Sequence, residues 1–144
     1  MTVTADASFL VSLYGVDVNT PAARAWMAAN ANPVLVTDAL RFETENALRL
    51  AHFRGKITEV DLKQALGEIE SDLATGILIS RDISSATHWA ECSRLSAAHT
   101  PALGSRAYDI THVAAALLLG AAILLSFDQR QRELAIHAGV TVAP

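Results

Sequence analysis

Four acidic residues stand at the edges of apolar segments, and their side chains are of the type that binds hard metal ions. Asp6 follows Val3-Thr4-Ala5, Glu43 lies within a helical pattern, Asp109 opens another, and Asp128 follows the apolar segment 123–127. Carboxylate oxygens suit Mg²⁺ or Mn²⁺. The four can meet only in a parallel sheet whose strand ends share one edge, where open α/β sheets place their ligand crevice.

Each aspartate taken alone has a simpler interpretation as a helix cap. Asp6, Asp109 and Asp128 directly precede helical patterns, and aspartate is a preferred N-cap residue. Gln131 lies three residues after Asp128, which completes a capping box. A single aspartate is therefore better explained by capping than by metal binding, and only the set points to a site.

Glu43 differs from the aspartates because helical phasing directs it toward apolar neighbours. Residues three, four and seven positions away share a helix face. Those around Glu43 are Ala39, Leu40, Asn46, Ala47 and Leu50, whereas Glu45 has Arg41 and Arg49 one turn to each side. We expect Glu43 to point inward, where a carboxylate needs a partner. It is either a metal ligand or a rim glutamate bonded to a backbone amide or an arginine.

Three further polar residues lie close to these acids in the sequence. His112 follows Asp109 by one turn and is interpreted as a core-edge histidine, because the other candidate ligands are all hard oxygens. Ser8 lies two residues after Asp6 and is either a partner of a metal-bound water or phosphate, or an ordinary first-turn residue. Ser126 precedes Asp128 by two residues.

Short apolar runs alternate with helical patterns, which predicts βαβ units and a parallel sheet covered on both faces. Strands are expected over Thr2–Ala5, Pro33–Thr37, Gly76–Ile79, Ala121–Ser126 and Val140–Val142. Helices are expected over Ala7–Tyr14, Thr20–Ala29, Asp38–Phe53, Thr58–Thr75, Ser84–Ala98, Asp109–Leu119 and Asp128–Ala138. A chain of 144 residues without repeats or linkers predicts a single domain over 1–144.

Composition and charge narrow the class of protein. Hydrophobic residues make up 51% and charged residues 18%, which predicts a dense core. The net charge of -4 excludes nucleic-acid binding by bulk attraction, so a nucleic-acid partner needs a basic patch or a metal ion. The candidates for a basic patch, each of which is also explained as solvated surface charge, are Arg41, Arg49, Arg54, Lys56, Arg106, Arg130 and Arg132.

The location expected from the sequence is the cytoplasm. The single cysteine, Cys92, cannot form an internal disulfide, which fits a reducing compartment. The start of the chain lacks a basic segment of the secretory type. The longest apolar run, Val113 to Phe127, falls short of the ~18 residues typical of a membrane span.

The order and spacing of four segments resemble the PIN-domain nucleases along nearly the whole chain, and more closely the toxin half of the VapBC toxin–antitoxin systems. The segments are Asp6-Ala7-Ser8, Glu43 to Arg49, Tyr108 to Ala114 and Ser126 to Arg132. The resemblance implies a three-layer α/β/α fold with a central, mostly parallel sheet of about five strands. Ser126 departs from the threonine more common in relatives; either hydroxyl can orient Asp128 or a metal-bound water.

The same resemblance implies a Mg²⁺- or Mn²⁺-dependent endoribonuclease that is the toxin of a type II toxin–antitoxin pair. Asp6, Glu43, Asp109 and Asp128 match the family's catalytic metal ligands, with Ser8, Ser126 and His112 in support. The reaction would be metal-assisted hydrolysis of an RNA phosphodiester. The implied partners are a VapB-type antitoxin, bound by the helices between Thr20 and Thr75, and a second copy of the chain in a homodimer.

Two other functions stay open from the sequence. The first is a non-catalytic PIN-like module that binds RNA or protein, although four converging carboxylates that repel one another serve no purpose in it. The second is a phosphatase of another α/β fold. Such enzymes usually carry two aspartates at the first strand end, whereas this chain has Ser8 at the second position.

Overall fold

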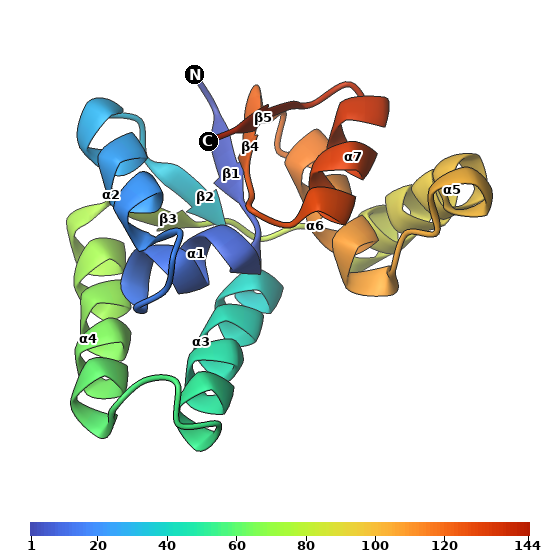
Figure 1. The fold of residues 1–144 in the computed structure, drawn as a ribbon. Coiled ribbons are helices and arrows are strands. Elements are labelled where there is room, and N and C mark those ends of the chain that lie inside the picture. Colours follow the sequence, from blue (N-terminus) through green and yellow to red (C-terminus); the bar gives the residue numbers. More distant parts are fainter.

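In the computed structural model, which describes residues 1–144, seven helices surround one five-stranded sheet (Figure 1). The strands are β1 (Val3–Ala5), β2 (Val34–Val36), β3 (Leu78–Ser80), β4 (Ile123–Leu125) and β5 (Thr141–Ala143). The helices are α1 (Ala7–Tyr14), α2 (Thr20–Ala29), α3 (Asp38–Phe53), α4 (Glu59–Thr75), α5 (Ser85–Leu103), α6 (Ala107–Leu118) and α7 (Gln129–His137). All the predicted elements are present.

The sheet has the order β3-β2-β1-β4-β5, and every neighbouring pair is parallel. The chain builds outward from β1 to β3 and then returns to place β4 on the other side of β1. The strand order therefore reverses between β1 and β4, which is where ligands bind in open α/β sheets. The predicted α/β fold with a parallel central sheet is confirmed.

Successive side chains of each strand point to opposite faces of the sheet, so the molecule has two separate hydrophobic cores, one on each face. Val3, Ala5 and Leu125 face the cluster that α1 to α4 cover. Leu124, one residue out of phase with Leu125, faces the cluster formed by α6 and α7. Figure 1 shows the helices of the first half (blue to green) gathered on one side and those of the second half (yellow to red) on the other. The result is the predicted three-layer arrangement.

The predicted boundaries are wrong mainly around α5 and α6. The prediction ended the helix at Ala98, but α5 continues through Pro101 to Leu103 and ends at Gly104, whose φ is +65°. A proline in the last turn removes only one backbone donor. Helix α6 begins at Ala107, so Arg106 is its N-cap residue and Asp109 lies inside its first turn, where its carboxylate accepts from the Arg106 amide at 3.4 Å.

Strand β3 is displaced from its predicted position by Gly76. This glycine has a φ of +80° and ends α4, which leaves Leu78 to Ser80 to pair with β2. A capping box is present at the start of α4, with Thr58 and Asp61 bonded to each other's backbone. None of the helices combines the length and the apolar composition needed to cross a bilayer.

Candidate active site

All four predicted acids line one cavity at the carboxyl-terminal edge of the sheet, with a volume of about 410 Å³. Asp6 lies at the junction of β1 with α1, and Asp128 lies at the junction after β4, where it caps α7. Asp109 comes from the first turn of α6 and Glu43 from the second turn of α3. The parallel topology therefore brings together residues from both halves of the chain.

Asp6 is the most deeply buried of the four acids, with only 1% of its surface exposed. Its Oδ1 accepts hydrogen bonds from the Ser8 hydroxyl (2.6 Å) and the Phe9 backbone amide (2.9 Å), and its Oδ2 accepts one from the Ser126 hydroxyl (2.5 Å). Burial raises the pKa of this carboxyl above its usual range, although the bonds from the two serines lower it. Asp6 is thus fixed by neutral donors, and no cationic side chain bonds to it.

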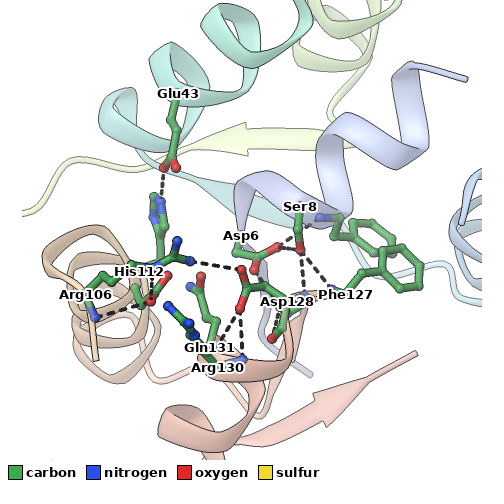
Figure 2. Close-up of polar contacts among 12 residues, drawn as sticks. Asp6, Ser8, Glu43, Arg106, His112, Phe127, Asp128, Arg130 and Gln131 are labelled. Carbon is green, nitrogen blue, oxygen red and sulfur yellow. Dashed lines mark hydrogen bonds and ion pairs between the residues drawn. The ribbon is translucent and has the colours of Figure 1, made fainter. Parts of the chain in front are cut away.

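The two serines also join the junction after β1 to the junction after β4. The Ser8 hydroxyl oxygen accepts hydrogen bonds from the backbone amides of Phe127 (2.9 Å) and Asp128 (3.1 Å). The Ser126 hydroxyl oxygen also accepts a bond from the Asp128 amide (3.1 Å). Figure 2 shows Ser8 between Asp6 and these amides. Ser126 therefore orients the side chain of Asp6, whereas for Asp128 it holds only the backbone.

Asp109 and Asp128 share one cation, the guanidinium of Arg106. Its Nε donates to Asp109 Oδ2 and its Nη2 to Asp128 Oδ2, both at 3.2 Å. Asp128 also caps α7 by accepting from the amides of Arg130 (2.9 Å) and Gln131 (3.2 Å). The predicted capping box is half formed, because the Asp128 amide bonds to the serines instead of to Gln131.

Glu43 does not face the interior as its helical phasing predicted. The buried stripe of α3 consists of Leu40, Thr44 and Leu48, one residue out of phase with Glu43. The side chain of Glu43 is 32% exposed, more than the 18% of Glu45, which forms the expected ion pairs with Arg41 and Arg49.

The carboxylate of Glu43 bonds to Nε2 of the buried His112, which satisfies the nitrogen of that core-edge histidine. In Figure 2 it points toward His112 and stands apart from Asp6 and Asp128. Glu43 is therefore a rim glutamate with a histidine partner, on the wall of the same cavity as the aspartates.

Gln131 is a site residue that the sequence suggested only as half of a capping box. It is buried, it lines the acid cavity, and its side-chain Nε2 has no hydrogen-bond partner. A buried amide of this kind costs free energy unless it is satisfied. A bound phosphate oxygen or water molecule would supply the missing partner. The only signal in the sequence that Gln131 belongs to the site was its position in the first turn of a helix that follows a strand end.

The donor set fits a hard divalent cation, although the side chains are not gathered around one point. Carboxylate oxygens from four different elements and an unsatisfied amide line the cavity. No three His, Cys, Asp or Glu side chains are grouped closely enough to hold a metal ion as they stand. The Arg106 guanidinium lies between Asp109 and Asp128, and a cation entering there would take its place.

Comparison of the sequence with protein families decides the identity of this fold. The pattern of the PIN domain matches residues 3–137. The chain belongs to the PIN domain family. A comparison with curated protein sequences gives no match.

Two solved structures have the fold of this PIN domain over nearly its whole length. One is the toxin VapC20 of Mycobacterium tuberculosis, with a TM-score of 0.72 and 17% identity over 99% of this chain and 100% of that one. The other is PAE2754 of Pyrobaculum aerophilum, with a TM-score of 0.65 and 16% identity over 99% of this chain and 89% of that one. At these identities the likeness establishes the fold alone.

Some of the candidate basic residues of this PIN domain, and one of its two tryptophans, are engaged in contacts within the fold. Arg41 and Arg49 are engaged by Glu45, and Arg132 donates to the carbonyl oxygens of Ser126 and Pro144. Trp26 packs edge-to-face against the buried Phe9, whereas the side chain of Trp89 is 60% exposed. Of the two tryptophans, Trp89 is the more exposed.

Proposed function

We propose that this protein is a divalent-metal-dependent endoribonuclease, the toxin of a type II toxin–antitoxin pair. The observation that carries the proposal is Asp6, a buried carboxylate at the point where the strand order reverses, with no cationic side chain bonded to it. Asp109 and Asp128 line the same cavity, and Arg106 is their only cationic partner. A carboxylate buried in this way is costly and is retained where it binds a cation.

Asp6, Asp109 and Asp128 would hold the ion, with Glu43 on the adjoining wall. A bound Mg²⁺ or Mn²⁺ supplies Lewis acidity, which activates water and neutralises charge during phosphodiester hydrolysis. The chain itself keeps Asp6 in one orientation through the hydroxyls of Ser8 and Ser126. The buried amide of Gln131 is placed to donate to a phosphate oxygen at the cavity.

RNA as substrate and an antitoxin as partner complete the proposal. Support comes from the family and from the fold of VapC20, which is described as a toxin that cleaves the sarcin–ricin loop. The helices predicted to bind an antitoxin leave Phe42, Phe53 and Val60 largely exposed. Exposed apolar surface of this kind is typical of a protein–protein interface. The homodimer and the cytoplasmic location stay predictions.

The test is cleavage of labelled single-stranded RNA by the purified protein. We expect cleavage in Mg²⁺ or Mn²⁺ and none in EDTA. Asp109→Asn should lower the rate by about 10²- to 10³-fold, the usual effect of removing one electrostatic stabiliser of a transition state. Glu59→Gln, on the exposed surface of α4, is the matched control and should cleave as wild type does. Wild-type cleavage by a folded Asp109→Asn variant would overturn the assignment.

A second candidate is a PIN module that binds RNA or protein without cutting it. The observation in its favour is that no three potential ligands are grouped as a metal site in the structure. On this alternative, the purified protein would bind RNA or a partner but would cleave no RNA in any divalent metal.

A further inference from the structure

A second cavity, about 620 Å³ in volume, adjoins the acid cavity along the same edge of the sheet. It lies between the loops that follow β2 and β3 and the first turns of α5 and α6. Ala107 and Tyr108 line both cavities. The second cavity is therefore close enough to the acids to receive a nucleotide next to the phosphate that the acid cavity would hold.

The wall of the second cavity presents aromatic rings to solvent. Trp89 is 60% exposed, and Tyr108, on the wall shared with the acid cavity, is 57% exposed. The His88 ring stacks on Trp89 with a centroid separation of 5.5 Å and an interplanar angle of 9°. His88 is itself held to α6, because its Nε2 donates to the carbonyl oxygen of Thr111 at 2.9 Å. One face of Trp89 is thus supported by His88, and the exposure of Trp89 leaves ring surface accessible to a flat ligand.

The charges around the cavity favour a base over a phosphate. Asp38 and Asp82 contribute two carboxylates, against the single guanidinium of Arg81. Carboxylates repel a phosphodiester, but they accept hydrogen bonds from the N–H groups on the edge of a nucleobase. A volume of about 620 Å³ lies within the ~300–1,000 Å³ range of small-ligand pockets.

We propose that this cavity binds an unpaired nucleobase of the RNA, stacked on Trp89, next to the phosphate held at the acid cavity. The inference rests on the proposed function and deepens it, since it makes the substrate single-stranded at the cleavage position. A base within a duplex has both faces covered and its edge paired, so it cannot enter. Stacking on an aromatic platform tolerates different bases, because every base has a π-face.

The experiment measures RNA binding without cleavage, in the Asp6→Asn background, by the anisotropy of a labelled single-stranded oligonucleotide. Trp89→Ala should raise Kd by about tenfold or more, the usual effect of losing one stacked base. Trp89→Phe should retain most of the affinity. The slope of log K against log salt should stay unchanged, since no phosphate contact is lost.

The matched control is Phe53→Ala, an aromatic truncation at the far end of α3. Phe53 is even more exposed than Trp89, and it lies fifteen residues along the helix from Asp38, roughly 22 Å at 1.5 Å per residue. Phe53→Ala should bind the single-stranded RNA with the same Kd as its parent. A duplex made from the same oligonucleotide and its complement is a second control, and Trp89→Ala should bind it as tightly as the parent does.

The outcomes separate this inference from the proposed activity. If Trp89→Ala binds single-stranded RNA with the affinity of its parent, the subsite is overturned whether or not the wild type cleaves RNA. If Trp89→Ala weakens binding while the wild type cleaves nothing in Mg²⁺ or Mn²⁺, the subsite stands and the proposed catalysis fails. A partner protein occupying the cavity in place of RNA would leave the Kd for RNA unaffected by Trp89, which also overturns the proposal.

Discussion

Two strand–aspartate–helix units lie side by side at the centre of the sheet, and their aspartates differ in burial and in ion pairing. In β1–α1 the acid follows the strand directly, so Asp6 is buried and bonded only to neutral donors. In β4–α7 two residues intervene, so the side chain of Asp128 is 31% exposed and is paired with Arg106. Both residues cap a helix, yet only Asp128 already has a counter-ion.

The difference shows how distance from the strand end sets the electrostatics of the acid. At the strand end itself the two faces of the sheet are covered by helices, and a carboxylate there loses its hydration. Two residues farther out, the long side chain of Arg106, the residue before α6, reaches the carboxylate. Asp6, in the first unit, therefore has no cationic partner and favours an incoming metal ion. Asp128, in the second unit, can bind a metal ion only by releasing Arg106.

The largest effect is expected from neutralising the buried acid. Asp6→Asn should lower RNA cleavage by about 10²- to 10³-fold, whereas Asp128→Asn should lower it by about tenfold. Asparagine caps helices as well as aspartate does, so both helices should persist. Rates on labelled RNA in saturating Mn²⁺ provide the measurement. Equal losses in the two variants would remove the distinction between the units.

Stability provides the control for Asp6→Asn. Because burial raises the pKa of Asp6, its ionised form is disfavoured in the folded protein, and the neutral amide removes that cost. Asp6→Asn should therefore unfold at a temperature no lower than wild type at neutral pH. Added Mn²⁺ should raise the melting temperature of wild type but not of Asp6→Asn. A variant that is simply unfolded would show no melting transition and would fail the first measurement.

A smaller effect is expected from removing the hydroxyl that holds Asp6 from the other unit. Ser126→Ala deletes a fully buried donor to Asp6 Oδ2, while the Asp128 amide keeps Ser8 as acceptor. Partners that orient metal ligands typically contribute about 10-fold in metal affinity. We expect the Mn²⁺ concentration for half-maximal cleavage to rise by about that factor.

Ser126→Thr is the matched control for that change, because it keeps the hydroxyl. It should stay close to wild type. If Ser126→Ala needs no more Mn²⁺ than wild type does, the hydroxyl does not orient a metal ligand.

Much of the fold followed from the sequence because strand and helix periods are local properties. Ala7–Tyr14, Thr20–Ala29 and Asp38–Phe53 were predicted with the observed boundaries. The parallel topology then placed the acids on one edge, as expected. The prediction was wrong at α5, which continues beyond its predicted end at Ala98 and contains Pro101 in its last turn.

The details of the site could not be read from spacing because they depend on contacts between distant segments. The pairing of Glu43 with His112 joins α3 to α6, and the bonds of Ser8 to the amides of Phe127 and Asp128 join α1 to the junction after β4. Arg106 lay just before a predicted helix start and was interpreted as one of several surface cations. Only the folded chain shows that it bridges two of the predicted ligands.

The smallest effect is expected from removing the counter-ion of the second unit. The side chain of Arg106 is 58% exposed, so solvent screens its two ion pairs and they contribute little to stability. Because the guanidinium and a metal ion compete for Asp109 and Asp128, Arg106→Gln should lower the Mn²⁺ concentration for half-maximal cleavage by about fivefold. Arg130→Gln, an exposed arginine in no ion pair, is the control and should leave it unchanged. If Arg106→Gln instead needs more Mn²⁺ than wild type, the arginine orients the two aspartates for the metal and does not compete with it. The two units would then differ only in how deeply their aspartates are buried.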